Sequence, residues 1–283
     1  MTAITTTNQS QRQPKYTAAE LSSHFLSFYQ FLTTLHYTPT DLKVPPPTGW
    51  PQLSSPTHLA SWNLHKSPFV LQVLAHLPYF APRTGSDANN NPGIHYKSAL
   101  IDYTSFTSAY FARPDGREAA VNLVNAAGDP VDSMDGFCIA WGRESGGRTL
   151  WLNVVDGEII EESLRCETVG AFDVVEYFDR MRTAYRELKL IPGKGMITME
   201  VWDVDERRER IAVEEVLRQT NEGATDLDWQ FVRQVYRDCG WPDALRGEEA
   251  AVRVEELLRE VWGEERYVLE GGAFSKGKGA GAA

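Results

Sequence analysis

Residues 136–162 read GFCIAWGRESGGRTLWLNVVDGEIIEE, and this stretch decides the fold. Residues 137–141 are apolar or aromatic and suit a half-buried strand, and the glycines of residues 142–147 allow the chain to turn back. Apolar side chains then alternate between two faces along residues 150–155, which is the period of a strand. Asp156-Gly157 favours a tight hairpin turn before a third strand. The pattern predicts an antiparallel meander at the centre of a sheet.

A helix is predicted over residues 171–190, directly after the meander. Its apolar residues recur every three or four positions and charged residues lie between them, so that one side can cover a face of the sheet. We expect the helix to end at Ile191-Pro192-Gly193, because proline cannot continue a helix. The apolar stripe consists of Phe172, Val175, Phe178, Met181, Tyr185 and Leu188.

Two more helices are predicted before the meander. Thr17 and Glu20 form a capping box at the start of a helix over residues 17–36, and Ser67-Pro68 begins a short apolar helix over residues 67–77. Between them, residues 37–56 carry six prolines, which predict an extended strap with Trp50 turned inward.

The remaining segments before the meander are a loop and a possible strand. Residues 81–95 consist of turn-forming residues and predict a surface loop. Residues 97–106 alternate and are expected to form a strand. The pattern of residues 110–135 leaves strand and helix both open.

The last third of the chain predicts an acidic helical extension over residues 196–270. It begins with a strand or bridge at residues 196–202, and helices are expected at residues 205–220, from Thr225, and at residues 248–262. We expect an α+β domain over residues 16–195, a disordered lead at residues 1–15 and a flexible tail at residues 271–283. The fold class is therefore α+β, a mainly antiparallel sheet packed by helices.

Charge and composition narrow the classes of partner. The net charge is −11, which argues against nucleic acid or an anionic membrane as the main partner. Residues 171–271 hold fifteen Lys+Arg and twenty-four Asp+Glu, so the acidic excess lies late in the chain. A polar N-terminus and the lack of a long apolar run predict a cytoplasmic or nuclear protein. The three cysteines lack metal-site spacing, and neither a metal nor a cofactor is predicted.

Catalytic motifs are tested and found incomplete. Residues 272–278 have the spacing of a phosphate-binding loop, but Gly279 stands where a hydroxyl is required. All six histidines precede residue 96 and none is paired at ligand spacing. The remaining enzymatic hypothesis is a dispersed active site that uses the carboxylates of Asp156 and Glu158 with Arg143.

The leading hypothesis is a non-enzymatic interaction or regulatory module that binds a protein partner through the acidic extension or an aromatic-lined groove. Tryptophan is a favoured anchor of protein interfaces, and the interaction candidates are Trp50, Trp151, Trp229 and Trp262. A purely structural subunit is a third possibility, for which a large exposed apolar patch would be the sign.

Four phrases of the sequence resemble a group of uncharacterised filamentous-fungal proteins, over roughly residues 20–195. They are FYQFL at residues 28–32, PPPTGWP at residues 45–51, HLPYF at residues 76–80 and AFDVVEYF at residues 171–178.

More distantly, the chain is similar to the SMI1/KNR4 (SUKH) superfamily. The similarity lies in the order of a Leu-Pro-aromatic phrase, a strand through residues 138–140, the residues 150–153, the Gly157 turn and a closing helix. Asn153, where an acidic residue is common, and the long insert between residues 81 and 135 depart from that pattern. The resemblance implies an α+β fold that acts by binding proteins.

Overall fold

The structure is a computed structural model of the chain. It describes residues 12–35, 39–54, 66–81, 93–105, 122–142, 147–163, 167–193, 197–220 and 225–269. Within these residues it is an α+β fold whose main sheet has six strands in the order β3-β4-β5-β6-β7-β8, with every neighbouring pair antiparallel. The strands are β3 (Gly93–His95), β4 (Ser98–Leu100), β5 (Gly136–Gly142), β6 (Arg148–Asn153), β7 (Glu158–Ser163) and β8 (Glu167–Asp173).

The predicted meander is confirmed as β5, β6 and β7. Leu152 pairs with Phe137 on one side and Ile159 on the other, and all three side chains are fully buried. The Asp-Gly turn forms as expected, with Gly157 at a positive φ of 68°.

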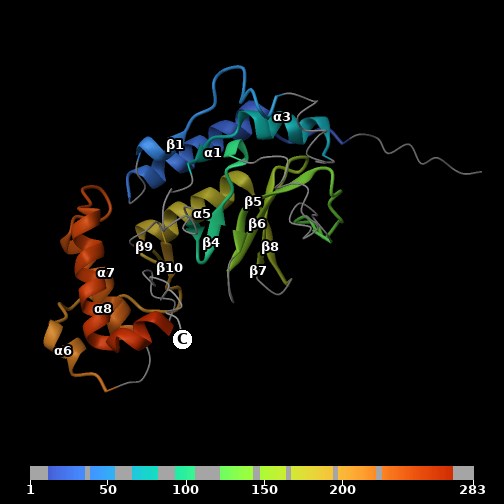
Figure 1. Cartoon of the computed structure of the whole chain (residues 1–283). Coiled ribbons are helices and arrows are strands. Elements are labelled where there is room, and N and C mark those ends of the chain that lie inside the picture. The colour runs from blue at the N-terminus through green and yellow to red at the C-terminus, as the bar shows by residue number, and fades with distance from the viewer. Residues whose placement is uncertain are drawn as a thin grey trace, which may run out of the picture.

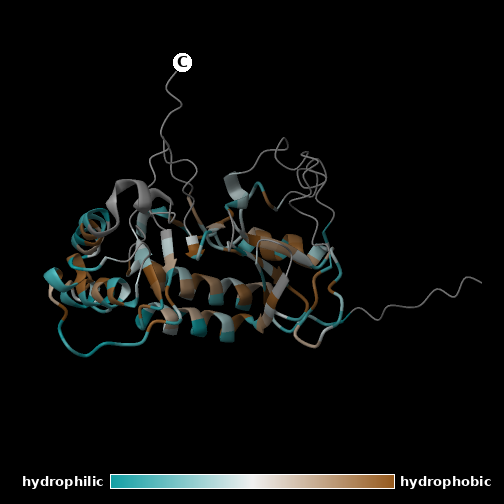
Figure 2. Ribbon diagram, turned by 90° about the horizontal axis from the view of Figure 1, so that it is seen from below, coloured by the Kyte–Doolittle hydropathy of each residue, from teal (hydrophilic) through white to brown (hydrophobic). Residues whose placement is uncertain are grey.

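Three helices pack together on one side of the domain: α5 (Val174–Arg186) lies on the main sheet, α1 (Ala18–Thr33) packs on α5 and α3 (Pro68–His76) packs on α1 (Figure 1). The capping box of Thr17 and Glu20 and the cap of Ser67 are both present, so the predicted starts of the first two helices are confirmed. In Figure 2 hydrophobic residues, in brown, lie beside hydrophilic residues, in teal, along the helices, as amphipathic covering helices require.

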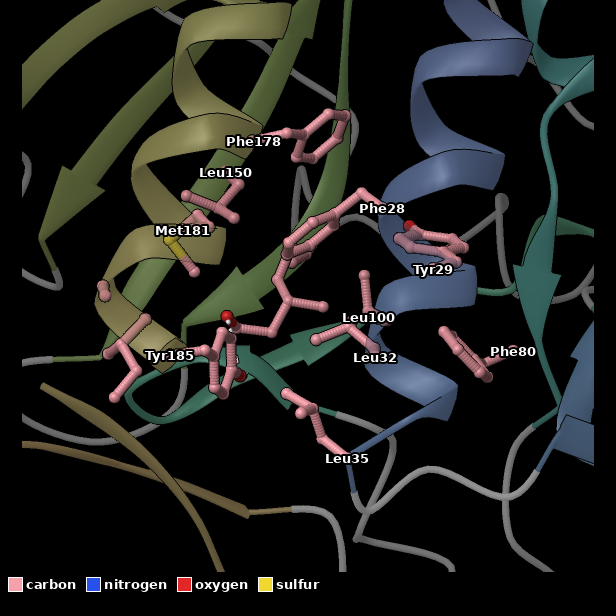
Figure 3. Packing of buried hydrophobic residues seen from close by; sticks show 14 of the residues in the cluster. Phe28, Tyr29, Leu32, Leu35, Phe80, Leu100, Leu150, Phe178, Met181 and Tyr185 are labelled. Atoms are coloured by element: carbon pink, nitrogen blue, oxygen red, sulfur yellow. Dashed lines mark hydrogen bonds between the residues drawn. The ribbon is translucent and has the colours of Figure 1, made fainter. Parts of the chain in front are cut away.

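The main core lies between these helices and the sheet (Figure 3). Phe28 of α1 stacks on Phe178 of α5 with ring centroids 4.5 Å apart, and Phe25 meets the same ring edge-on at 4.9 Å. The opposite face of the sheet carries a smaller cluster in which Leu123 packs with Cys138, Trp151 and Ile160. Both faces of the central strands are therefore buried.

The prediction for residues 171–190 was wrong at both ends. Residues 171–173 belong to β8, a strand that was not predicted, and the Asp173 side chain caps α5 by accepting a hydrogen bond from the Val175 N–H at 2.9 Å. Leu188, at a positive φ of 54°, turns the chain after the helix. Pro192 does not end the helix but lies in β9 (Leu190–Gly193), which pairs with β10 (Ile197–Glu200).

Both edges of the main sheet are protected. On β8, Val169 is an extra residue between the pairs Glu161–Gly170 and Glu162–Thr168, and its exposed side chain marks a bulge that interrupts the edge. On β3, the Thr198 hydroxyl of β10 donates to the Gly93 carbonyl at 3.1 Å. These features leave little continuous strand edge for a further strand.

Other predictions of local structure were partly wrong. The loop predicted at residues 81–95 includes strand β3, while residues 82–92 lie outside the described part. The strand predicted at residues 97–106 is limited to β4, followed by a 3₁₀ turn, η2 (Tyr103–Ser105). In the undecided segment, residues 122–135 form neither a helix nor a strand and contain one isolated bridge, Val124–Pro130.

The N-terminal segment and the strap run along the domain surface. Residues 12–15, predicted as part of a disordered lead, are placed, and the Lys15 backbone N–H donates to the Val155 carbonyl at 2.9 Å. The described part of the strap contains a 3₁₀ turn, η1 (Pro39–Asp41), and β1 (Leu42–Lys43), which pairs with β2 (Tyr79–Phe80).

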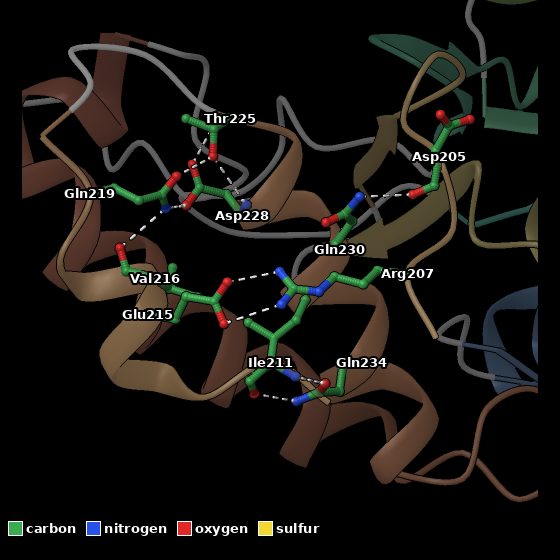
Figure 4. A network of polar contacts seen from close by, with 10 residues as sticks. All are labelled: Asp205, Arg207, Ile211, Glu215, Val216, Gln219, Thr225, Asp228, Gln230 and Gln234. Carbon is green, nitrogen blue, oxygen red and sulfur yellow. Dashed lines mark hydrogen bonds and ion pairs between the residues drawn. The ribbon is translucent and has the colours of Figure 1, made fainter. Parts of the chain in front are cut away.

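The acidic extension contains α6 (Val213–Leu217), α7 (Asp226–Asp238) and α8 (Gly247–Leu269). The capping box of Thr225 and Asp228 is present, which confirms the predicted start of α7. The helix predicted at residues 205–220 is reduced to α6, because side chains satisfy the backbone before it. The Gln234 side chain accepts a hydrogen bond from the Ile211 N–H and donates one to the Ile211 carbonyl. Gln230 donates to the Asp205 carbonyl at 3.1 Å (Figure 4).

Arg233 of α7 connects the extension to the sheet domain. Its guanidinium is almost fully buried and donates to the carbonyls of Leu188 at 3.1 Å, Val201 at 2.8 Å and Val204 at 2.7 Å. The Trp241 indole N–H donates to the Arg186 carbonyl at 3.0 Å. The extension and the end of α5 therefore share buried hydrogen bonds.

Candidate functional site

The carboxylate of Asp156, a candidate from the enzymatic hypothesis, belongs to a turn network. It accepts hydrogen bonds from the side-chain amides of Asn153 at 2.8 Å and Asn125 at 3.1 Å, and Arg12 lies 3.8 Å away. Asn153 in turn accepts from the backbone N–H groups of Val155 and Asp156. These contacts stabilise the β6–β7 turn, so a structural role is sufficient to explain an aspartate at position 156.

Glu158 lies beside the same turn. Burial raises the pKa of its carboxyl, the backbone N–H of Ala126 at 3.2 Å opposes that shift, and the charge of Asp156 adds to it. The third residue of the enzymatic hypothesis, Arg143, lies outside the described residues. The structure therefore brings Asp156 and Glu158 together in a structural turn.

The tryptophans proposed as interaction anchors are engaged within the chain where they are described. Trp50 is half-buried and its indole N–H donates to the Leu77 carbonyl at 2.8 Å. Trp151 is buried and donates to the Glu162 carboxylate at 2.6 Å. Trp229 is half-buried against the main core. The side chain of Trp262, in α8, is outside the described part.

Arginines pair with many of the acidic groups of the extension. Arg207 meets Glu215 at 2.8 Å (Figure 4) and Arg210 meets Asp238 at 2.9 Å. Such exposed pairs contribute little stability, about 0–1 kcal/mol each, but they reduce the local negative field. The extension therefore attracts a basic partner less strongly than its count of acidic residues indicates.

Exposed apolar side chains are concentrated in the extension. Of the seven large apolar residues exposed among the described residues, four lie between residues 202 and 252: Trp202, Val213, Leu217 and Val252. Val213 and Leu217 are four residues apart on α6 and so lie on the same side of that helix. Val216, fully buried, attaches α6 to the rest of the extension.

A cluster of polar side chains, four of them buried and two half-buried, brings together residues of α5 and several strands, with Ser98 paired across the strands with His95. We call it the polar cluster: His95, Ser98, Arg148, Glu161, Tyr177 and Glu200. These residues come from β3, β4, β6, β7, α5 and β10. They meet because the sheet curls, which brings the Tyr96 carbonyl of the β3–β4 turn to the Arg148 N–H at 3.3 Å.

Arg148 is at the centre of the ionic contacts in the polar cluster. Its Nε is 3.1 Å from Glu161 Oε1 and its terminal nitrogen is 3.5 Å from Glu200 Oε1. On the other side of Glu161, the same carboxylate oxygen is 3.8 Å from His95 Nε2. His95 Nδ1 accepts the backbone N–H of Tyr96 at 2.7 Å, so the proton of the neutral ring lies on Nε2, toward Glu161.

Three polar atoms of the polar cluster have no hydrogen-bond partner among the described residues. They are Ser98 Oγ, Arg148 Nε and Tyr177 Oη, and they are the complete set of such buried side-chain atoms in the described part of the chain. The contact of Arg148 Nε with Glu161 is an ion pair that does not meet the geometry of a hydrogen bond. An unmet buried donor costs about 1–3 kcal/mol, so these three atoms require an explanation.

Burial governs the protonation of the polar cluster. It lowers the pKa of His95 to about 3, with the charges of Arg148 and Arg180 acting in the same direction, so the imidazole is neutral near pH 7. Burial raises the pKa of the Glu161 carboxyl, Arg148 opposes that shift and Glu200 adds to it. Burial also raises the pKa of Tyr177 well above its ordinary value.

Sequence reasoning missed the polar cluster, although a signal was present. Arg148 has the same alternation parity as the buried Leu150, and Glu161 has that of the buried Ile159, so both charged residues occupy core-facing strand positions. A charge at such a position in a central strand is unusual and suggests a buried pair.

Comparisons with known proteins and searches of the described residues add no assignment. No family model, curated protein or solved structure matched the chain, and the resemblance to the SMI1/KNR4 superfamily stays a prediction. The described residues hold no group of three or more His, Cys, Asp or Glu that could bind a metal ion. None of the described helices is both long and apolar enough to cross a membrane.

Proposed function

We propose that the protein is a non-catalytic protein-interaction module of the cytoplasm or nucleus whose acidic extension receives a partner. The observation that carries this proposal is the concentration of exposed apolar side chains on the extension, where Val213 and Leu217 are each 39% exposed. Single exposed apolar residues are common, but two on one side of a short helix form a larger apolar contact.

The chemistry around α6 indicates the kind of partner. Glu214 lies exposed between Val213 and Leu217 in sequence, and the extension as a whole is acidic. A complementary segment would place one or two apolar side chains against α6 and Lys or Arg beside them. The partner is therefore a basic segment with apolar anchors, and nucleic acid or a membrane surface is not expected.

The test is selection of binding peptides from a random display library on the full chain. The double variant Val213→Ser/Leu217→Ser removes the apolar contact, and Val44→Ser, at a residue 53% exposed in the strap, is the matched control. Basic peptides with apolar anchors that bind the wild type and Val44→Ser, but not the double variant, would support the proposal.

Selected peptides that keep full affinity for the double variant would place binding elsewhere, and a selection without basic, apolar-anchored peptides would overturn the proposal. Point variants are preferable to a truncated chain. Removing residues after 195 would also remove Arg233, which satisfies the carbonyl of Leu188 in the sheet domain. Truncation would therefore confound lost binding with lost folding.

A further inference from the structure

We propose that the polar cluster binds a small carboxylate anion, of the size of formate or acetate, through Ser98, Arg148 and Tyr177. Ser98 and Tyr177 each present a buried hydroxyl without a hydrogen-bond partner among the described residues, and Arg148 Nε faces Glu161 at 3.1 Å without the geometry of a hydrogen bond. The proposal is independent of the interaction surface on α6, since none of the cluster residues belongs to the extension's helices.

The unmet atoms select the chemistry of the ligand. Arg148 Nε can only donate a hydrogen bond, and the two hydroxyls can each donate one. A ligand that satisfies them must therefore present acceptor oxygens, and a carboxylate carries two on one small group. A metal cation would offer no acceptor to the guanidinium.

The charges around the cluster are compatible with an anion when Glu161 takes up a proton. Glu161 is faced by Arg148 of β6, His95 of β3, Arg180 of α5 and Glu200 of β10. With both carboxylates ionised the two arginines are balanced, whereas protonation of Glu161 leaves one positive charge in excess. Binding is therefore expected to strengthen as the pH falls.

Burial limits the size of the ligand and indicates where it enters. Ser98 and Tyr177 are each 2% exposed, while the Arg148 and Glu200 side chains are 22% and 15% exposed. The cluster is thus closed on the side of α5 and β4 and reaches solvent at Arg148 and Glu200. This enclosure favours a small ligand with a single carboxylate group.

The experiment is calorimetric titration of the full chain with sodium formate and sodium acetate at constant ionic strength, with acetamide as the neutral comparison. We expect saturable binding of the anions and much weaker binding of acetamide. Tyr177→Phe and Ser98→Ala, which each remove one donor with little change of shape, should each weaken anion binding by about tenfold. Tyr79→Phe, whose hydroxyl donates to the Leu74 carbonyl outside the cluster, is the control and should bind as the wild type does.

A second variant tests the charge argument. Glu161→Gln imitates the protonated carboxyl, so it should bind formate more tightly than the wild type at neutral pH and lose the pH dependence. Absence of saturable anion binding to the wild type would overturn the proposal, as would unchanged affinity in both Tyr177→Phe and Ser98→Ala. The variant Val213→Ser/Leu217→Ser should bind formate normally, which separates this proposal from the proposed function.

Discussion

Replacing Arg233 by methionine should destabilise the whole chain, because this side chain connects the extension to the sheet domain. The guanidinium donates to three backbone carbonyls, those of Leu188, Val201 and Val204, at 2.7–3.1 Å. Methionine fills a similar volume but donates nothing, so the carbonyls lose their partners. Each hydrogen bond to a charged group contributes about 1.5–3 kcal/mol, and removing the buried charge recovers part of its desolvation cost.

The net expectation is a loss of about 3–5 kcal/mol in the free energy of unfolding, a large share of the roughly 5–15 kcal/mol of a typical domain. The assay is urea denaturation followed by circular dichroism. The matched control is Arg237→Met, one helical turn further along α7, where the side chain is 43% exposed and pairs with Glu206 at 2.7 Å. That exposed pair should contribute about 0–1 kcal/mol.

Two results would contradict the reasoning. If Arg233→Met and Arg237→Met unfold at the same urea concentration, the three buried hydrogen bonds do not stabilise the chain as described. If Arg233→Met splits unfolding into two transitions while the later one keeps the wild-type midpoint, the extension is an independently folding unit and does not stabilise the sheet domain. A single transition shifted to lower urea supports a shared core.

Three further predictions concern a cap, a turn and a buried histidine. Thr225→Ala should cost about 1 kcal/mol by removing the cap of α7, whereas Thr225→Ser should cost much less, as measured by urea denaturation. Gly157→Ala should cost about 1–3 kcal/mol, because φ is +68° and the new methyl would clash with the Tyr16 ring; adding Tyr16→Ala should recover only the cost of the clash. His95 has a folded pKa of about 3, below its unfolded value of about 6.5, so the unfolded state takes up its proton first and stability is lost as the pH falls below 6.5. Between pH 7 and pH 5, His95 should account for a loss of about 2 kcal/mol in the free energy of unfolding, and the variant His95→Gln should lack this part of the pH dependence. NMR of the folded protein at pH 5 should show a neutral imidazole.

The helices with strong end signals and the central meander could be predicted from the sequence. Thr17 with Glu20, Ser67 and Thr225 each mark a helix start through a side chain within three residues, and such local hydrogen bonds are visible in the sequence. The Asp-Gly turn and the alternation before it are equally local. Structure that depends on neighbouring residues alone was therefore recovered.

Strand β8 was missed because a local signal was misleading. Phe172 continues the three-and-four spacing of α5 backwards and was assigned to the helix, yet it lies in β8 opposite Ile159. The cap formed by Asp173 was the better boundary signal. The helix predicted over the charged segment before α6 was wrong because a distant contact overrides the local signal. Its residues favour a helix, but glutamine side chains from α7 satisfy its backbone, and a distant element cannot be read from local propensity.

Arg233 and the polar cluster could not be predicted because their partners are distant in sequence. Arg233 looks like one charged residue on a helix surface, and its acceptors lie 29–45 residues away. His95 and Glu161 belong to strands that are separated by three others in the sheet. Only the curl of the sheet places them 3.8 Å apart, and a curl leaves no mark on the spacing of residues.

Residues 200 and 201 link the two proposals physically. Glu200 ends β10 and lies 3.5 Å from Arg148 in the polar cluster, while the next residue, Val201, accepts a hydrogen bond from Arg233 of α7. A partner that moved the extension would therefore change the position of Glu200, and with it the charge that faces an anion beside Arg148. Because such coupling between two binding events is reciprocal, an anion in the polar cluster would change the affinity for the partner by the same factor. Measuring peptide affinity with and without formate follows directly from this geometry, and equal affinities would show that the two sites act independently.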